Sequence, residues 1–180
     1  MILPRGPVVD RHRIDILSSV MLIRSAQSTD APAIWRIIRP TIRAGETYAL
    51  DRDMTEQAAL AYWLGNDRQA FVAEDAGQIV GTYYIRPNQL GGGRHICNCG
   101  YMTDPAATGR GVARAMCQHS LDLARQQGYR GMQFNFVVSS NARAVKLWQS
   151  FGFEIVGRLP KAFRHPTVGE VDALVMFRAL

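Results

Sequence analysis

The segment Pro105–Ala113 carries the residue types that bind phosphate groups. Its sequence is Pro-Ala-Ala-Thr-Gly-Arg-Gly-Val-Ala, and it lies where a predicted strand passes into a predicted helix. Gly109 and Gly111 would let a ligand approach the backbone, and the first amide groups of the helix would point at that ligand. The segment therefore predicts a site for an anion such as a pyrophosphate.

Two familiar phosphate-binding loops do not fit this segment. A Walker loop needs Gly-Lys followed by Ser or Thr, which is missing here. A Rossmann loop needs a third glycine, and Arg114 stands in its place. A plain turn that begins a helix remains the alternative at this point.

Asn98 and Asn135 are the other polar residues placed where they could do chemistry. Each lies within a predicted central strand, and a buried amide there must find hydrogen-bond partners. An asparagine cannot remove a proton at neutral pH, but it can orient an acceptor amine, a carboxylate or a relaying water. The alternative is that both amides serve ordinary hydrogen bonds of the core.

The pattern of apolar residues predicts the elements that position these groups. Asp75-Ala76-Gly77-Gln78 is typical of a hairpin turn. A crossover helix between the strands over 95–102 and 132–138 implies that these two strands are parallel. The predicted helices begin at 30 and end before Pro40, then cover 56–64, 112–127 and 142–151, with a loop over 41–51. The predicted strands cover 22–24, 70–74, 79–85, 95–102, 132–138, 153–159 and 171–177.

Length and composition limit what the protein can be. A chain of 180 residues, 47% hydrophobic and 20% charged, suits one globular domain. We expect that domain over residues 21–180. Residues 1–20 are expected to be a poorly ordered extension, either a tail from an upstream start codon or a regulatory arm.

Charge and cysteine content exclude several classes of protein. The net charge is +6, but the arginines are scattered without a basic run, so we expect no nucleic-acid partner. The charge suits an anionic small ligand. Three cysteines without CxxC spacing indicate neither a disulfide framework nor a metal site. No apolar stretch reaches the roughly 18 residues of a membrane span, so a cytoplasmic location without membrane contact is expected.

Two motifs resemble the GNAT superfamily of acyl-CoA-dependent N-acetyltransferases. The first is Thr108-Gly109-Arg110-Gly111-Val112-Ala113, which matches the glycine-rich signature of that family at all but its first position. The second consists of Asn141, Ala144, Leu147, Trp148, Gly152 and Phe153. The resemblance extends over about residues 21–180. It implies an α/β fold with a mixed, mostly antiparallel central sheet, a parallel splayed strand pair and flanking helices.

The resemblance also implies a site for acetyl-CoA as co-substrate, without a metal. Pantetheine would lie between the two splayed strands, along the backbone of Tyr101, Met102 and Thr103, and Asn141 would contact the cofactor arm. Thr108 replaces an arginine or glutamine, which removes a side-chain contact but leaves the amide groups. The remaining implied contacts to the pyrophosphate come from Thr108, Gly109, Arg110, Gly111, Val112, Ala113 and Arg114. Arg143 or Lys146 could add positive charge.

In this family the acceptor amine typically attacks the thioester directly. Cys97 and Cys99 are therefore expected to be strand residues rather than nucleophiles. A tyrosine often protonates the departing thiolate, but Trp148 stands at that position and an indole cannot act as a general acid. The proton would come from water or from another hydroxyl such as that of Tyr84.

The acceptor site is less well defined by the resemblance. Glu46 stands in a loop where related small-molecule acetyltransferases place an acidic residue, so it is a candidate base, or else a solvated carboxylate. Asn135 is the second catalytic candidate. The candidates for acceptor binding are Tyr48, Asn98, and the residues Arg164 and His165 in a predicted turn between the last two strands.

The segment Met132–Val138, followed by Asn141 and Trp148, and the predicted turn Phe163–Pro166 resemble the small-molecule branch of the family. That branch includes amino-acid, proline-analogue and phosphinothricin acetyltransferases. The function implied is transfer of an acetyl group from acetyl-CoA to the amine of a small, amino-acid-like acceptor. The alternatives are a protein or peptide N-acetyltransferase, and a non-catalytic acyl-CoA-binding sensor. The resemblance also implies a possible homodimer, formed through sheet edges or the closing strands.

Overall fold

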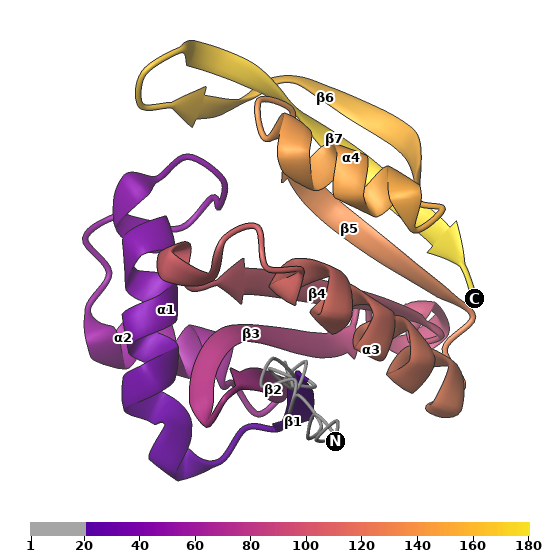
Figure 1. Ribbon diagram of the computed structural model, residues 1–180. Helices are drawn as coiled ribbons and strands as arrows, with labels where there is room; N and C mark the ends of the chain where they lie inside the picture. Colours follow the sequence, from indigo (N-terminus) through magenta and orange to yellow (C-terminus); the bar gives the residue numbers. More distant parts are fainter. Residues whose placement is uncertain (1–20) are drawn as a thin grey trace, which may run out of the picture.

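The computed structural model describes residues 21–180, so the prediction for residues 1–20 lies outside the described residues. A seven-stranded sheet runs through the molecule in the order β1-β2-β3-β4-β5-β7-β6 (Figure 1). Its strands are β1 (Leu22–Ser25), β2 (Gln69–Asp75), β3 (Gln78–Pro87), β4 (Ile96–Thr103), β5 (Gly131–Val138), β6 (Glu154–His165) and β7 (Gly169–Ala179). Among the described strands, only β4 and β5 pair in parallel. The predicted mixed sheet is confirmed.

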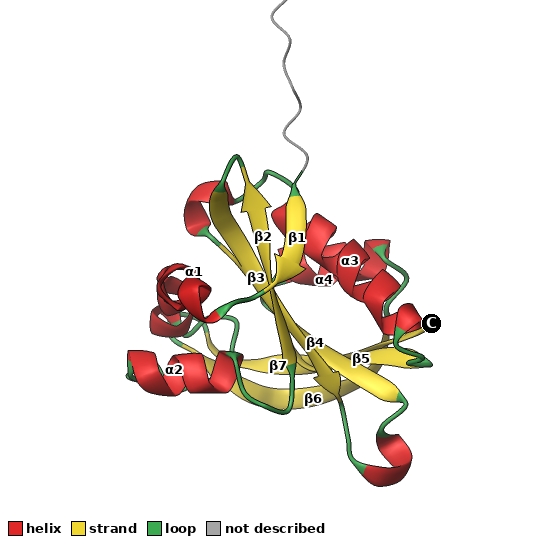
Figure 2. Cartoon of the chain, turned by 90° about the horizontal axis from the view of Figure 1, so that it is seen from below, coloured by secondary structure: helices red, strands yellow, loops and turns green. Residues whose placement is uncertain are grey.

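Two pairs of helices cover the two faces of the sheet (Figure 2). The four helices are α1 (Ala31–Ala44), α2 (Glu56–Trp63), α3 (Val112–Gln126) and α4 (Ala142–Ser150), with short 3-10 turns at Ser28–Asp30, Gly91–Gly93 and Pro105–Ala107. Helices α1 and α2 pack on one face around the buried Trp63. Helices α3 and α4 pack on the other, around Met116 and Trp148. Successive strand residues point to opposite faces, so Tyr83 and Tyr84 belong to different clusters.

The parallel pair β4–β5 is short and splayed. Only Ile96 opposite Gly131 and Cys97 opposite Met132 are in register, and the two strands then diverge (Figure 1). The carbonyl of His95 accepts from the N–H of Arg130, so the odd-numbered residues of β4 turn their backbone groups toward β5. Beyond Cys97, these groups face a gap in the sheet.

Helix α1 is longer than predicted, because it continues through Pro40. A proline removes one backbone N–H, and the expectation was a helix that ends before it. Ile42 extends the apolar stripe of Ile34 and Ile38 by one more turn and is buried, which favours the longer helix. The helix ends at Gly45, whose φ of +64° suits glycine and whose N–H bonds to the carbonyl of Thr41.

The last two strands also differ from the prediction. Arg164 pairs with Glu170 and His165 with Gly169 in the β6–β7 ladder, so these two residues end strand β6 rather than forming a turn. Irregularities in the ladder between Ile155 and Gly157 and between Leu159 and Phe163 let the strands continue past local mismatches. The turn itself is reduced to residues 166–168.

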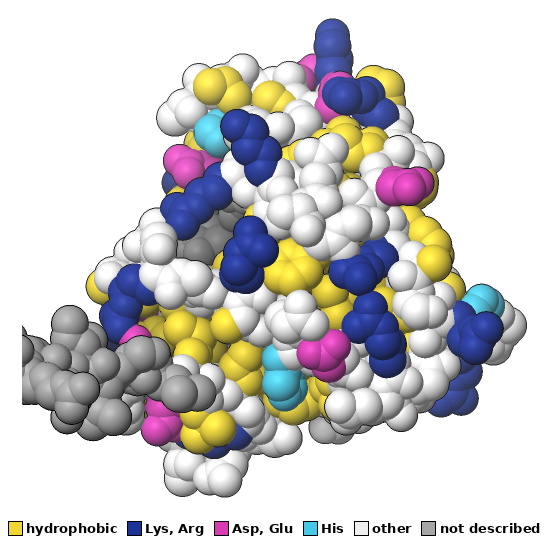
Figure 3. Space-filling view, turned by 45° about the vertical axis from the view of Figure 1, so that its right-hand side comes forward, with side chains coloured by type: hydrophobic (Ala, Val, Ile, Leu, Met, Phe, Trp, Pro, Cys, Tyr) yellow, Lys and Arg dark blue, Asp and Glu magenta, His cyan; other side chains and the backbone are white. Residues whose placement is uncertain are grey.

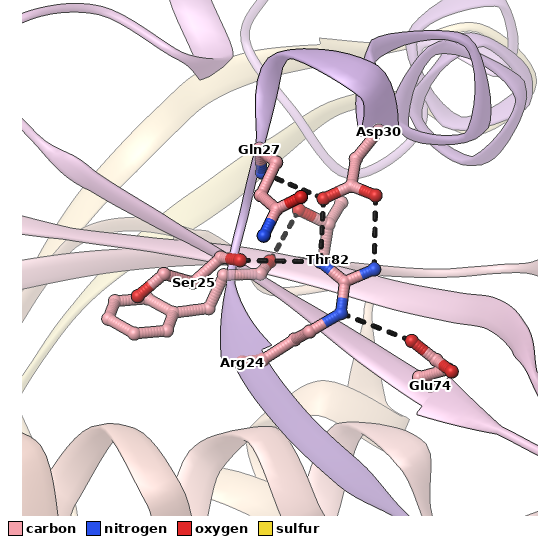
Figure 4. Close-up of polar contacts among 7 residues, drawn as sticks. Arg24, Ser25, Gln27, Asp30, Glu74 and Thr82 are labelled. Atoms are coloured by element: carbon pink, nitrogen blue, oxygen red, sulfur yellow. Dashed lines mark hydrogen bonds and ion pairs between the residues drawn. The ribbon is translucent and has the colours of Figure 1, made fainter.

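An ion-pair network fixes the start of the domain (Figure 4). The guanidinium of Arg24 in β1 donates to both carboxylate oxygens of Asp30, at 2.7 and 3.1 Å, and to Glu74 of β2 at 3.1 Å. The N–H of Gln27 also donates to Asp30, at 2.7 Å. The hydrogen bonds from Arg24 are the main reason why the pKa of Asp30 is lowered. The network therefore joins β1, β2 and the entry to α1.

The surface carries its positive charge in dispersed form. Figure 3 shows Lys and Arg side chains spread over one face among acidic and uncharged residues, without a continuous stripe on that face. Within residues 21–180, no helix combines the length and the apolar character needed to cross a membrane.

Candidate functional site

The loop before α3 presents unpaired amide groups. The first bond within the helix runs from the N–H of Ala115 to the carbonyl of Gly111, so the N–H groups of Val112, Ala113 and Arg114 precede it. Gly111 is the N-cap and offers no side chain to bind these donors. Gly109 and Gly111 have φ values of +88° and +80°, and a Cβ on either would meet no atom within 4 Å. This geometry suits an anion at the helix N-terminus.

A cavity of about 490 Å³ lies beside these amide groups. We call it the cradle cavity. It is lined by Tyr101, Thr103, Ala107, Thr108, Gly109, Gly111, Val112, Ala113, Arg114, Arg143, Ala144, Lys146, Leu147, Trp148 and Ser150. Most of the residues predicted to hold the cofactor are therefore brought together here. Arg143 and Lys146 add positive charge from α4.

Three of the predicted cofactor residues lie elsewhere. Arg110 forms an ion pair with Asp75 at the β2–β3 turn and lines neither of the two cavities. Met102 stands opposite Thr82 in the ladder with β3, so its backbone is turned away from the gap. Asn141 accepts a hydrogen bond from the N–H of Ala144 at 3.2 Å, and so caps α4 as predicted. Met102 and Asn141 both line a second cavity.

This second cavity, of about 350 Å³, lies where β4 and β5 separate, and we call it the inter-strand cavity. It adjoins the cradle cavity, because Tyr101, Thr103, Ala144 and Trp148 line both. Its other lining residues are Thr41, Thr47, Tyr48, Ala49, Leu50, Tyr62, Tyr84, Arg86, Asn98, Cys99, Gly100, Met102, Phe134, Asn135, Phe136, Val137, Val138 and Asn141. Ligands bound in the two cavities would therefore be close to one another at the splay.

Both predicted asparagines line the inter-strand cavity. The side chain of Asn98 donates to the carbonyl of Gln133 at 2.8 Å, just beyond the last paired residues of β4 and β5. Asn135 donates to the side-chain oxygen of Asn88 at 2.6 Å and accepts from the side chain of Gln133 at 2.8 Å. The amides are thus oriented by neighbours and also border the cavity.

Tyr48, in the loop between α1 and α2, contacts the backbone of β4, which the sequence did not predict. Its hydroxyl donates to the carbonyl of Tyr101 at 2.9 Å and accepts from the N–H of the same residue at 2.8 Å. The ring packs edge-on against Trp63, with 6.2 Å between ring centroids. Burial raises the pKa of Tyr48 above its ordinary value, so the hydroxyl is neutral at physiological pH.

Three of the predicted catalytic and acceptor residues are not part of these cavities. Glu46 is exposed, and neither cavity is lined by it. Arg164 pairs with Glu170 at 3.4 Å at the end of β6, and His165 accepts from the N–H of Thr167. The loop and strand lengths that separate these residues from the gap could not be inferred from local patterns.

Arg86 was missed by sequence reasoning. It is the last residue but one of strand β3, lines the inter-strand cavity and donates to Asp67 at 2.9 Å. A single basic residue at the end of an otherwise apolar strand was the available signal. Tyr62 and Tyr84 line the same cavity, and their hydroxyl oxygens are 3.4 Å apart.

Trp148 and the cysteines bear on the reaction. Trp148 lies where the two cavities meet, with its ring centroid 5.0 Å from that of Tyr101. Cys97, Cys99 and Cys117 are free and buried. Burial raises the pKa of Cys99 well above its usual range, so this thiol is protonated and a poor nucleophile. These features suit direct attack by an acceptor amine.

Comparisons with known proteins agree with this geometry. The sequence model of the acetyltransferase (GNAT) family matches residues 32–153. A solved GCN5-related N-acetyltransferase from Kribbella flavida is 44% identical, with a TM-score of 0.85 over 89% of this chain and 98% of that one. The N-acetyltransferase aca1 of Schizosaccharomyces pombe is 27% identical over 74% of this chain and 72% of its own length.

A further relative is described by the acceptors it uses. It is the L-methionine sulfoximine/L-methionine sulfone acetyltransferase of Salmonella typhimurium, 25% identical over 78% of this chain and 84% of its own length. The family match spans the loop before α3, the splayed strands and the whole of α4. The chain thus belongs to the GNAT family and is an acetyl-CoA-dependent N-acetyltransferase.

Proposed function

We propose that this enzyme acetylates the amine of a small, amino-acid-like acceptor bound in the inter-strand cavity. Acetyl-CoA would occupy the cradle cavity and extend its pantetheine arm into the gap between β4 and β5. The observation that carries the proposal is that the two cavities adjoin at Tyr101, Thr103, Ala144 and Trp148. The thioester and the amine would meet there.

The residues around the cradle cavity suit the groups of acetyl-CoA. The unpaired N–H groups of residues 112–114 would bind the pyrophosphate, and Arg143 and Lys146 would add positive charge. The backbone groups of Tyr101 and Thr103 face the gap and would pair with the amide groups of pantetheine. Asn141 would contribute from the start of α4.

The reaction would proceed by direct attack of the amine nitrogen on the thioester carbonyl carbon. The N–H of Tyr101 faces the gap and would stabilise the negative oxygen that forms. The C–S bond then breaks, the amine loses a proton and the thiolate of CoA gains one. Asn98 and Asn135 would orient the acceptor rather than move its proton.

The charge of the inter-strand cavity supports an anionic group on the acceptor. Arg86 is the one charged side chain among its described lining residues, and no carboxylate or histidine lines it within residues 21–180. A carboxylate on the acceptor would be attracted to Arg86. The acceptors named for the Salmonella relative, which carry an amine and a carboxylate, suit such a cavity.

The experiment that tests the proposal is a thiol-release assay with acetyl-CoA. The acceptors would be amino acids, methionine sulfone, proline analogues, polyamines and peptides, each with wild-type enzyme and Asn135→Ala. We expect turnover on an amine that carries a carboxylate, with kcat/KM about ten- to hundredfold lower in the variant, as for a lost hydrogen bond to a charged group.

Asn66→Ala is the matched control, because Asn66 lies outside both cavities. It should retain the wild-type rate. Turnover on peptides alone would indicate the protein-acetylating alternative and contradict the proposed acceptor. Acetyl-CoA binding without turnover on any amine would contradict the proposal as well.

A further inference from the structure

The contact between Tyr48 and β4 occupies the backbone that the reaction needs. The N–H and the carbonyl of Tyr101 both face the gap between β4 and β5, where a neighbouring strand would normally bind them. Both are bonded instead to one hydroxyl, that of Tyr48, at 2.8 and 2.9 Å. A side chain from the loop between α1 and α2 thus takes the place of a missing strand.

A single N–H cannot make two full hydrogen bonds at once. A thioester oxygen that accepts from the N–H of Tyr101 would lie within about 3 Å of it, in the position held by the Tyr48 hydroxyl. The two acceptors therefore exclude each other. The Tyr48 hydroxyl also gives up its bond to the Tyr101 carbonyl when it leaves, because both bonds come from the same oxygen.

We propose that Tyr48 is a positioning residue that holds the Tyr101 backbone in the ligand-free enzyme and is displaced when acetyl-CoA binds. The inference rests on the proposed function, in which the pantetheine arm and thioester enter this gap. Acetyl-CoA would thus remove a neutral phenol from its own site. The protein would bind acetyl-CoA more weakly than an enzyme with a free gap, because binding requires that two hydrogen bonds first be broken.

Displacement of Tyr48 would also change the acceptor side. Thr47, Tyr48, Ala49 and Leu50 all line the inter-strand cavity, so movement of the hydroxyl reshapes the wall that contacts the acceptor. The inter-strand cavity would then reach the shape that binds the acceptor only after acetyl-CoA is bound.

The test uses Tyr48→Phe, which removes the hydroxyl and keeps the ring that packs against Trp63. Calorimetry of acetyl-CoA should give a dissociation constant about five- to thirtyfold lower than wild type, the change expected when one or two competing hydrogen bonds are removed. Tyr62→Phe is the matched control. Its hydroxyl lines the same cavity but contacts Tyr84 rather than the backbone of β4.

A truncated ligand locates the effect. Adenosine 3′,5′-bisphosphate carries the nucleotide end of the cofactor but no pantetheine and no thioester, so it does not reach the gap. Its affinity should be equal in wild type, Tyr48→Phe and Tyr62→Phe. A gain in affinity for this ligand in Tyr48→Phe would place the effect elsewhere and overturn the proposal.

A second measurement uses the wild-type protein alone and does not depend on a stable variant. Magnetisation transfer between the ring of Tyr48 and the N–H of Tyr101 should be seen in the free protein and lost with saturating acetyl-CoA. Persistence of that transfer in the complex would overturn the proposal, as would equal acetyl-CoA affinity of Tyr48→Phe and wild type. Failure of the wild-type protein to bind acetyl-CoA would instead contradict the proposed function.

Discussion

At the scale of single residues, the described lining of the inter-strand cavity holds few groups that could accept a proton. Its described lining residues include four tyrosines, two asparagines besides the cap Asn141, and Arg86, but no carboxylate and no histidine. Burial raises the pKa values of Tyr48, Tyr84 and Tyr101, so these phenols are not anionic bases near neutral pH. The acceptor amine would therefore lose its proton to water.

The pH dependence of the rate tests this idea. We expect log kcat/KM to rise with pH until it passes the pKa of the acceptor amine itself, because only the neutral amine attacks. Two acceptors whose amines differ in pKa should give two profiles displaced by that difference. A common inflection for both acceptors would reveal an enzyme base and contradict the account.

Glu46 provides a second residue-scale prediction. Because its carboxylate is exposed and lines neither cavity, Glu46→Gln should leave kcat/KM within about threefold of wild type, a change of under roughly 1 kcal/mol. The thiol-release assay with the best acceptor measures it. Loss of a hundredfold or more would return Glu46 to the role of base.

Trp148 provides a third prediction at the scale of single residues. The indole borders both cavities and packs on Tyr101, and its N–H is too weakly acidic to protonate a thiolate. Its role would therefore be to shape the site. Trp148→Phe should raise KM for acetyl-CoA several-fold and change kcat less. Steady-state kinetics separate the two, and a large fall in kcat with an unchanged KM would count against a shaping role.

At this scale, several residues that the sequence singled out line the two cavities. Gly109 and Gly111 were singled out because glycine lets a ligand approach the backbone before a helix, and the structure gives both a positive φ. Asn98 and Asn135 were found because amides are conspicuous within apolar strands. The position of Tyr48 on the backbone of β4 depends on the path of a loop, which no local pattern encodes.

At the scale of elements, the short β4–β5 ladder creates the site. A crossover helix predicts that two strands are parallel, but it does not predict where their pairing stops. The resemblance to the GNAT family predicted that β4 and β5 splay apart, and the structure confirms that they separate after Cys97. The continuation of α1 through Pro40 was missed, because burial of Ile42 outweighs the local penalty for proline.

The Arg24–Asp30 pair gives a prediction about the start of the domain. Asp30→Asn should lower the free energy of unfolding by about 2 kcal/mol at neutral pH, because it removes charge-assisted hydrogen bonds from Arg24. The folded-state pKa of Asp30 lies below its ordinary 3.8. Its contribution is therefore complete above that value and is lost as the pH falls toward the folded-state pKa.

Urea unfolding at neutral pH and at about pH 3 measures both parts of this prediction. The difference between wild type and Asp30→Asn should shrink at the lower pH. Asp122→Asn is the matched control, since Asp122 forms an exposed pair with Arg125 and should cost less than about 1 kcal/mol. Equal effects of the two substitutions would mean that the network does not fix β1.

At the scale of the whole molecule, two cavities meet at one break in the sheet, and the proposed function depends on both. Helix α3 supplies unpaired amide groups to the cradle cavity. The loop after α1 and the end of β3 supply part of the lining of the inter-strand cavity. The motifs in the sequence predicted the fold and singled out many of the residues that line the cradle cavity. The inter-strand cavity combines residues from distant segments, so only the folded chain brings Tyr48, Arg86 and Asn135 together.

The most direct test of this account is calorimetry of acetyl-CoA against wild type, Ala113→Trp and Gln118→Trp. Ala113 lines the cradle cavity in the first turn of α3, whereas Gln118 is exposed on the same helix outside both cavities. We predict that wild type and Gln118→Trp bind equally and that Ala113→Trp loses binding by a hundredfold or more. Unchanged affinity of a folded Ala113→Trp would contradict the placement of acetyl-CoA at the start of α3.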